Sequence, residues 1–255
     1  MNPTEAAALR VPRPREHAAV RLACFPHAGG GAEAYTALAG ALPDDIEVLA
    51  LQYPGRRERR AVPGAADIAE LAGEAARALE PYADRPLSLL GHSMGALVAF
   101  ETARLLEQRR TLGRLFVSAA RPPGEDWEER DLDTLTDERL VAELRRLGGV
   151  PEQLLREPDV VEEILRLLRA DHRALRRYGW PVDAAVRAPV SALLADADPK
   201  NTAEQMRGWA RHTTGAFDLQ VLSGGHFALL ERASGTVRLL AGTLRADAAP
   251  ADVAG

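Results

Sequence analysis

The stretch Gly91-His92-Ser93-Met94-Gly95 decides the fold, because it lies where a short apolar run gives way to a helical pattern. Residues 86–90 (PLSLL) are typical of a buried strand, and residues 96–110 (ALVAFETARLLEQRR) of a helix without internal Pro or Gly. In a tight strand-to-helix turn, side chains at positions 91 and 95 would crowd the neighbouring backbone, which explains the two glycines. The pattern predicts a G-x-S-x-G elbow that presents the Ser93 hydroxyl at a helix N-terminus, above the carboxyl edge of a sheet.

A serine hydroxyl is a poor nucleophile at neutral pH, so Ser93 needs a base and a group that orients this base. In hydrolases built around such an elbow, the chain order is Ser, then Asp or Glu, then His. His226 follows a strand-like run at 217–222 (FDLQVL) and two glycines whose loop can bring an imidazole over the serine. We therefore expect His226 to be the base. The other histidines after Ser93 are His212, expected at the surface, and His172, expected in the apolar stripe of a helix.

The acid is expected after the preceding strand, at 189–195 (PVSALLA), where Asp196 and Asp198 compete. Asp198 stands further into the loop, and Pro199 holds the residue before it in an extended conformation. Asp196, at the strand end, is equally suited to terminate the strand or cap the turn. We favour Asp198 as the residue that orients His226, with Asp196 as the alternative.

Acyl transfer also needs two donors for the developing oxyanion, and the first is the backbone N–H after the nucleophile, at Met94. The second is expected in the loop after an earlier strand, and the run 21–25 (RLACF) is followed by Pro26-His27-Ala28-Gly29-Gly30-Gly31. Ala28 is the candidate, because a glycine-rich loop brings amides close to a reacting carbonyl. We assign no chemical role to His27. Phosphate binding is the weaker interpretation of this loop, because neither G-x-G-x-x-G nor a Walker lysine is present.

Strand-like runs alternate with helical patterns, which predicts an α/β fold with a mostly parallel central sheet flanked by helices. The predicted strands cover 21–25, 47–52, 86–90, 115–119, 189–195 and 217–222, and the clearest helices 67–80 and 96–110. We expect a single domain over residues 1–255, with residues 1–17 and 246–255 flexible. Ligands of such sheets bind beyond the carboxyl ends of the strands, where the candidate residues would converge.

Residues 121–187 break the alternation, because they read as consecutive helices without a convincing strand. Thr136 is a candidate cap for one helix, and a longer helix is expected from Asp159 to near Gly179. An insertion at this point of the sheet lies over the nucleophile, so we interpret it as a helical lid that shapes an acyl chamber. The alternative is an insertion that only stabilises the fold. Three residues of the longer helix can accordingly face either the substrate or the core: Leu165, Leu168 and His172.

Composition argues against several classes of function. Among the 255 residues, 32 Lys and Arg stand against 37 Asp and Glu, and the net charge of −5 disfavours non-specific nucleic-acid binding. No apolar stretch approaches the ~20 residues needed to cross a bilayer, and the N-terminus lacks the apolar run of a secretion signal. The single cysteine, Cys24, fits a reducing cytosol, and no Cys or His cluster indicates a metal. We therefore expect a cytoplasmic protein, monomeric by default, without a metal or a membrane partner.

Five motifs together resemble the type II thioesterases of polyketide and nonribosomal peptide synthesis: Phe25-Pro26-His27-Ala28-Gly29-Gly30, Tyr53-Pro54-Gly55-Arg56, Gly91-His92-Ser93-Met94-Gly95, Asp198-Pro199 and Gly224-Gly225-His226-Phe227. The likeness runs from about residue 20 to about residue 240. It implies an α/β-hydrolase that cleaves acyl thioesters from the phosphopantetheine arm of carrier proteins, freeing stalled synthases. The phosphopantetheine belongs to the substrate, so no cofactor of the enzyme itself is implied. Carried over residue by residue, the resemblance implies a nucleophile, acid and base at Ser93, Asp198 and His226, with an oxyanion hole formed by the amides of Ala28 and Met94.

The densest basic cluster follows Tyr53-Pro54-Gly55 and consists of Arg56, Arg57, Arg59 and Arg60. Carrier proteins are usually acidic, so a basic patch near the chamber mouth would help to dock one. A solvated loop with Arg–Glu pairing is an equally good interpretation, because surface charges contribute little. Arg56 can instead make an internal bond that fixes the loop.

Two other classes of function remain open at this point. One is a carboxylesterase or lipase-like hydrolase of oxygen esters on the same fold, and the other is a non-catalytic subunit that binds carrier proteins. The candidate triad and the glycine-rich loop argue against the second class. Only the family resemblance separates a thioester from an oxygen ester, because a fold does not determine its substrate.

Overall fold

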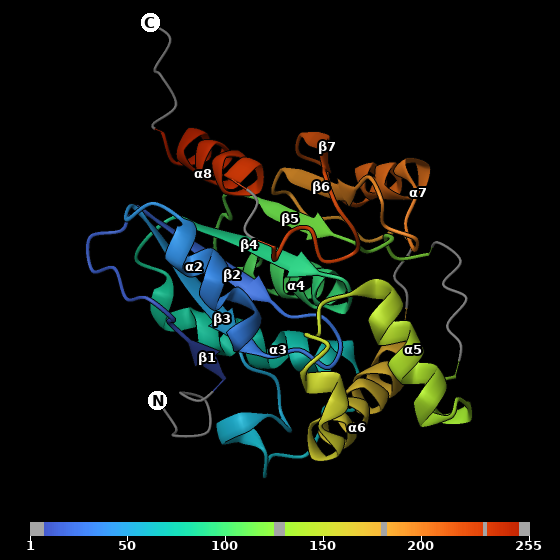
Figure 1. The fold of residues 1–255 in the computed structure, drawn as a ribbon. Helices are drawn as coiled ribbons and strands as arrows, with labels where there is room; N and C mark the ends of the chain where they lie inside the picture. The colour runs from blue at the N-terminus through green and yellow to red at the C-terminus, as the bar shows by residue number, and fades with distance from the viewer. Residues whose placement is uncertain (1–7, 125–130, 180–182, 232–233, 250–255) are drawn as a thin grey trace, which may run out of the picture.

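The computed structural model of this chain describes residues 8–124, 131–179, 183–231 and 234–249. Its centre is a sheet with the strand order β1-β3-β2-β4-β5-β6-β7, in which β1 runs antiparallel to β3 and the other pairings are parallel (Figure 1). The strands are β1 Leu9–Arg10, β2 Val20–Phe25, β3 Ile46–Leu51, β4 Leu87–His92, β5 Leu115–Ser118, β6 Val190–Ala195 and β7 Phe217–Leu222. The mostly parallel sheet predicted from the sequence is confirmed.

Helices cover both faces of this sheet (Figure 1). The α-helices are α2 Thr36–Ala41, α3 Ile68–Leu79, α4 Met94–Leu106, α5 Asp137–Leu147, α6 Pro158–Arg176, α7 Ala203–Arg207 and α8 Ser234–Ala248. Short 3-10 turns occupy Ala32–Tyr35, Arg57–Arg59, Glu80–Tyr82, Leu132–Thr134, Leu154–Arg156 and Gly208–His212. Apolar residues of α3 and α4 belong to one core cluster, and those of α2 and α8 to another. Burial on both faces explains why β2, β3, β4 and β6 are mostly apolar and why every residue in them is buried.

The six strands predicted from the sequence are confirmed, with ends that shift by two residues or fewer. The short edge strand β1 was not predicted, because two residues cannot show a periodicity and the strand depends on its pairing with β3. Helices α2 and α8 were not predicted either. Thr136 caps α5 as expected, since its side chain accepts the N–H of Arg139.

The described parts of the two chain ends, for which we predicted flexibility over residues 1–17 and 246–255, make hydrogen bonds with the rest of the fold. Leu9–Arg10 pairs with β3, and the buried Arg15 guanidinium donates to the carbonyl oxygens of Ala39 at 2.8 Å and Leu42 at 2.7 Å. At the other end, α8 continues to Ala248, and Asp247 accepts a hydrogen bond from Arg114 Nε at 2.7 Å. Hydrogen bonds and ion pairs thus tie parts of residues 8–17 and 246–249 to the rest of the fold, and the flexibility of the chain ends stays a prediction. Residues 1–7 and 250–255 lie outside the described part.

The described part of residues 121–187 contains helices joined by loops and no strand, as predicted. Between β5 and β6 its described residues form α5 and α6, and among them only Val186 makes a β contact, an isolated bridge to Thr213. Figure 1 places α5 and α6 beyond the carboxyl ends of β4 and β5. The longer helix, α6, begins one residue before and ends three residues before the predicted 159–179. The insertion therefore lies where the sequence placed a lid.

Candidate active site

Ser93 sits on the strand-to-helix turn that the sequence predicted. Its φ of 54° and ψ of −126° are strained values for a residue with a side chain, and α4 begins at the next residue, Met94. The backbone N–H of Ser93 donates to the Ser118 carbonyl at 2.8 Å, which ties the turn to β5. A side chain at position 91 would lie 2.5 Å from the backbone nitrogen of Ala96, so a glycine there is a steric requirement. The elbow is thus held by close backbone packing.

Gly95 gives a direct test of this packing. A Cβ added at Gly95 would lie 2.5 Å from the Pro26 carbonyl oxygen and closer still to that of Phe25. We expect Gly95→Ala to lower the free energy of unfolding by about 3 kcal/mol, because neither backbone atom can move without displacing β2. Urea unfolding measures the loss. Gly40→Ala is the matched control, since a Cβ at this helical position meets nothing within 4 Å and alanine favours helix. A Gly95→Ala protein as stable as the wild type would contradict the packing argument.

His226 and Asp198 form a buried hydrogen-bonded pair. Nδ1 of His226 lies 3.1 Å and 3.0 Å from the two carboxylate oxygens of Asp198. Asp198 also accepts the N–H of Lys200 at 2.9 Å and the side-chain amide of Asn201 at 2.8 Å. Burial opposes the charge of Asp198, but the hydrogen bonds from His226, Asn201 and Lys200 hold its pKa below the usual range. A carboxylate that stays ionised beside Nδ1 keeps a proton there and leaves Nε2 as the basic nitrogen of the neutral ring.

The structure separates the two aspartates that compete in the sequence. Asp196 is exposed, and its Oδ1 accepts the N–H of Gly224 at 2.9 Å. It therefore holds the loop that carries His226, whereas Asp198 contacts the imidazole itself. The geometry agrees with the preference for Asp198.

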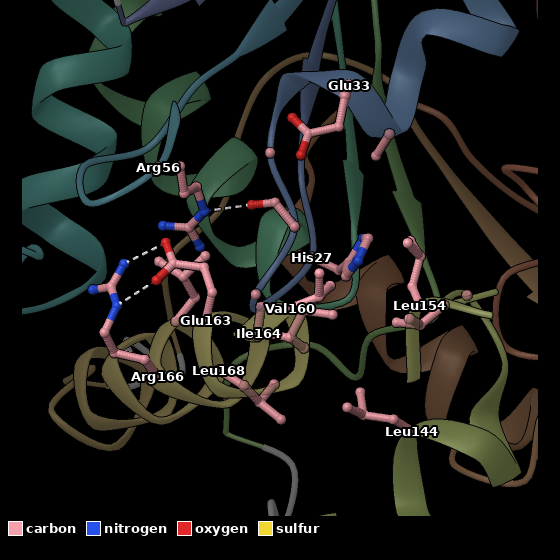
Figure 2. Close-up of a pocket in the computed structure, with 18 of the residues that line it drawn as sticks. His27, Glu33, Arg56, Leu144, Leu154, Val160, Glu163, Ile164, Arg166 and Leu168 are labelled. Atoms are coloured by element: carbon pink, nitrogen blue, oxygen red, sulfur yellow. Dashed lines mark hydrogen bonds and ion pairs between the residues drawn. The ribbon is translucent and has the colours of Figure 1, made fainter. Parts of the chain in front are cut away.

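Ser93 and His226 line the same cavity, which has a volume of about 1230 Å³. One wall is the loop after β2, from His27 to Gly31, and the opposite wall comes from the helical insertion. Figure 2 shows the aliphatic side chains of Val160, Ile164 and Leu168 of α6 and Leu144 of α5 gathered around the cavity below His27. The cavity thus joins the elbow, the His226 loop and both helices of the insertion, as a lid over a chamber requires.

The loop after β2 presents Ala28 to this cavity, and α4 starts beneath it at Met94. Gly29 adopts a φ of 79°, in the left-handed region that favours glycine. Its N–H donates to Asp171 of α6 at 2.7 Å, and the Gly30 carbonyl accepts from Arg56 Nε at 2.5 Å. Both predicted oxyanion donors therefore belong to segments at the cavity, and α6 contacts one of these segments directly.

Two of the three predicted chamber residues, Leu168 and His172, line the cavity. Leu165 takes the other alternative and packs in the core instead of lining the chamber, because its side chain is only 2% exposed and is absent from the lining. Leu167 lines the cavity in its place. The apolar stripe of α6 is wide enough to serve both the packed interior and the cavity, and helical spacing alone does not separate these two uses.

Two further histidines, His92 and His27, lie near His226, although the sequence suggested no role for either. The ring centroid of His92 lies 5.3 Å from that of His226, and the His27 ring packs edge-on against His92 at 5.8 Å and Phe227 at 4.9 Å. Burial, with repulsion from a charged His226, lowers the pKa of His27 to about 3 and that of His92 well below its ordinary value. Both rings are therefore neutral near pH 7. The sequence signal that could have placed them near His226 is that His27 directly precedes Ala28 and His92 directly precedes Ser93.

His172 is a third histidine held neutral, because burial lowers its pKa to about 4. His212 corrects a prediction: it is 1% exposed instead of lying at the surface, and its Nδ1 lies 2.8 Å from the Ala184 carbonyl. The polar residues around His212 in the sequence concealed its contacts with the core residues Phe100 and Trp209.

The neutral histidines predict a loss of stability in mild acid. His27, His92 and His172 bind protons less readily in the folded protein than in the unfolded chain, where histidine titrates near 6.5. Their contribution to stability is therefore present above about pH 6.5 and is lost as the pH falls towards the folded values. Each should lower the free energy of unfolding by about 1.4 kcal/mol per pH unit below pH 6.5. Urea unfolding between pH 7 and pH 5 measures the slope.

The variant His172→Gln tests one member of this set. Removing one titrating ring should reduce the slope of stability against pH by about one third in the same interval. A slope equal to that of the wild type would show that His172 is not held neutral in the folded protein.

The basic cluster does not form one exposed patch, so the docking prediction is wrong for Arg56 and Arg59. Arg56 is 4% exposed and pairs with Asp171, while Arg59 pairs with Glu74 and donates to the Gln52 carbonyl at 2.7 Å. Only Arg57 and Arg60 are exposed, and both line the cavity. The internal bond considered for Arg56 is confirmed.

Neither a metal site nor a membrane-spanning helix is found among residues 8–124, 131–179, 183–231 and 234–249. Within these ranges, no group of three or more His, Cys, Asp or Glu side chains is placed to hold a metal ion. No helix in the described part of the chain has the length and apolar character needed to cross a membrane. Cys24 is buried in β2.

Comparison with known proteins agrees with this geometry. A sequence model of the family described as "Thioesterase domain" matches residues 20–244. The chain is 42% identical over 219 residues to the thioesterase PikA5 of Streptomyces venezuelae, covering 85% of this chain and 78% of that protein. It is 39% identical over 249 residues to a probable cadicidin biosynthesis thioesterase of Streptomyces griseus, covering 97% and 69% respectively. Among solved structures it is similar to the type II thioesterase BorB from the borrelidin biosynthetic cluster, with a TM-score of 0.85, 41% identity and coverage of 94% and 98%.

Proposed function

Because this chain belongs to the thioesterase family, we propose that it releases acyl groups from phosphopantetheinyl carrier proteins of a polyketide or nonribosomal peptide synthase. The observation that carries the proposal is the cavity lined by both Ser93 and His226, with His226 hydrogen-bonded to the buried Asp198. A nucleophile, a base and a group that orients the base are the parts needed for acyl transfer through an acyl-serine.

In the first half of the reaction, Nε2 of His226 takes the proton of the Ser93 hydroxyl as its oxygen attacks the thioester carbonyl carbon. Asp198, ionised and bonded to Nδ1, stabilises the imidazolium that forms. The tetrahedral intermediate then expels the pantetheine sulfur, which receives the proton from His226, and an acyl-serine remains. In the second half, a water molecule loses its proton to His226 and attacks the acyl-serine, and the released Ser93 oxygen regains that proton.

Negative charge develops on the carbonyl oxygen in both halves. We assign its stabilisation to the backbone N–H groups of Ala28 and Met94, each worth roughly 3 kcal/mol in the transition state. The N-terminus of α4 adds a favourable field at the same place, because helix dipoles direct partial positive charge to that end.

The lining of the cavity suits an acyl chain and its carrier arm. Leu144, Leu154, Val160 and Ile164 form an aliphatic wall from the insertion, against which an acyl chain can be buried. Arg57 and Arg60 are exposed at the same cavity, so we retain these two residues as the candidates that meet an acidic carrier protein. The lid role of the insertion is part of this proposal.

The remaining features of the proposal follow from this reaction. The hydrolysis needs no cofactor of the enzyme, since the phosphopantetheine arrives with the substrate. The partner is a carrier domain and not a nucleic acid or a membrane, and we propose that the protein acts as a cytoplasmic monomer.

A parallel hydrolysis assay tests the substrate. Acetyl-, propionyl-, longer acyl- and aminoacyl-carrier proteins are compared with p-nitrophenyl esters of equal acyl length, and kcat/KM is measured for each. We expect at least one carrier thioester to be preferred over its matched ester. A general preference for the esters would assign the protein to the oxygen esterases, since the triad serves both reactions.

Labelling with a fluorophosphonate separates an enzyme from a subunit that only binds carriers. We expect the probe to modify Ser93, and peptide mapping identifies the residue. A protein that binds acylated carrier without labelling or turnover would be a non-catalytic subunit, contrary to the proposal.

A further inference from the structure

A buried carboxylate from the insertion contacts the loop that carries Ala28. Asp171 lies in α6, its side chain is 9% exposed, and its Oδ2 accepts the N–H of Gly29 at 2.7 Å. Leu168, one turn earlier, covers the same place, because a Cβ at Gly29 would lie 3.7 Å from the Leu168 Cβ. Helix α6 is therefore packed on this loop as well as lining the cavity.

Arg56 completes the contact from the loop after β3. Its guanidinium pairs with the same Oδ2 of Asp171, while Nε donates to the Gly30 carbonyl at 2.5 Å and Nη1 to the Pro54 carbonyl at 2.9 Å. Figure 2 shows Arg56 beside the loop that carries His27, with a dashed line to the loop. Asp171 and Arg56 thus hold the loop at two successive residues, by the amide of Gly29 and by the carbonyl of Gly30.

These contacts matter because the loop is poorly constrained by its own sequence. Three consecutive glycines, Gly29 to Gly31, allow many backbone conformations, and Gly29 adopts a positive φ of 79°. The N–H of Gly29 shares a peptide plane with the Ala28 carbonyl, so fixing this plane restricts the direction of the Ala28 N–H one peptide earlier. An oxyanion donor is effective only when its direction is set before the reaction.

A contribution to stability does not by itself explain the buried ion pair of Asp171 and Arg56. Burial raises the pKa of the Asp171 carboxyl, against the charge of Arg56 and the hydrogen bond from Gly29. Removing two charges from water is costly, and a pair of apolar side chains often stabilises an interior equally well. The directional hydrogen bonds of a carboxylate and a guanidinium supply what apolar residues cannot, which is a defined orientation of the backbone.

We propose that Asp171 and Arg56 are positioning residues that hold the Ala28 amide in place for the oxyanion, and that the insertion is thereby part of the catalytic machinery. The proposal rests on the acyl transfer described above. Its consequence is that the oxyanion hole is complete only while α6 lies across the loop.

The test compares Asp171→Ala, Asp171→Asn and Arg56→Lys with the wild type, using a butyryl-pantetheine thioester as substrate. The variant Glu74→Gln is the matched control. It breaks the ion pair between Glu74 and the buried Arg59, which lies in the same segment as Arg56 but away from the Ala28 loop. For each protein, kcat, KM, the rate of fluorophosphonate labelling and the melting temperature are measured.

For Asp171→Ala we expect kcat and the labelling rate to fall about 10- to 100-fold, with KM changing less than about 3-fold, because oxyanion donors act mainly in the transition state. Asp171→Asn keeps an acceptor oxygen and should recover part of the loss, and Arg56→Lys should fall between the wild type and Asp171→Ala. Glu74→Gln should lower the melting temperature and leave kcat within about 2-fold of the wild type.

Two results would overturn the proposal. The first is that kcat of Asp171→Ala and Asp171→Asn stays within about 3-fold of the wild type. The second is that Glu74→Gln, with an equal decrease in melting temperature, loses as much kcat as the two Asp171 variants. The wild-type control keeps this failure distinct from a failure of the proposed function. If the wild type is labelled at Ser93 and hydrolyses the thioester, a normal Asp171→Ala refutes only the positioning role. An inactive, unlabelled wild type refutes the proposed reaction itself.

Discussion

Replacing Ser93 with alanine is expected to lower the turnover of an acyl-carrier substrate about 10⁴- to 10⁶-fold. The hydroxyl oxygen is the atom that would carry the acyl group, so its removal abolishes the covalent route and leaves only the contribution of the oxyanion donors and of substrate binding. Single-turnover release of the acid from an acyl-carrier protein measures the loss. Substrate binding should change little, because the aliphatic wall of the cavity is untouched.

The fold should survive this substitution. Alanine keeps the Cβ that the turn already accommodates at a φ of 54°, and the backbone hydrogen bond to Ser118 is retained. We expect the melting temperature to stay within about 3 °C of the wild type. A folded Ser93→Ala protein with wild-type turnover would refute the mechanism.

Asp198→Asn should lower kcat by about 10⁴-fold. An asparagine at this place can turn an N–H group towards Nδ1 of His226, which then carries the proton on Nε2, where the base is needed. It also removes the negative charge that stabilises the imidazolium. Steady-state kinetics on the preferred acyl-carrier substrate give the measurement, and the melting temperature confirms that the protein is folded.

Asp196→Asn is the matched control, because it makes the same chemical change two residues away. The side-chain oxygen of asparagine can still accept the N–H of Gly224, so the loop that carries His226 should keep its position. We expect kcat within about 3-fold of the wild type. If Asp196→Asn were the inactive variant and Asp198→Asn the active one, the assignment of the acid would move to Asp196.

Much of the candidate site follows from the sequence because parallel strands end at the same edge of a sheet. Ser93, Asp198 and His226 each follow a strand of their own, β4, β6 and β7, and the fold rule for open parallel sheets places such residues together. The glycines of the elbow were equally predictable, since a Cβ at Gly91 would meet backbone atoms of the same turn and a Cβ at Gly95 those at the end of β2. In both cases a local pattern has only one structural outcome.

The errors share a different origin. The sequence of α6 shows an apolar stripe, yet it did not reveal that Leu165 packs inside while Leu168 faces the cavity. Nor did the charges of Arg56 and Arg59 reveal their burial, because the partners Asp171 and Glu74 are remote in the chain. Amphipathic periodicity identifies a buried face without identifying what covers it.

By itself, the sequence determined the elbow, the positions of Ser93, Asp198 and His226 after strands of their own, and the helical insertion between β5 and β6. Steric exclusion and hydrophobic periodicity act over a few residues, so these features can be read from short stretches. Only the tertiary structure shows that Asp198 and not Asp196 contacts His226, and that Asp171 accepts a hydrogen bond from the loop after β2. Hydrogen bonds form or fail within a few tenths of an ångström, and such distances between remote residues are set only when the whole chain is packed.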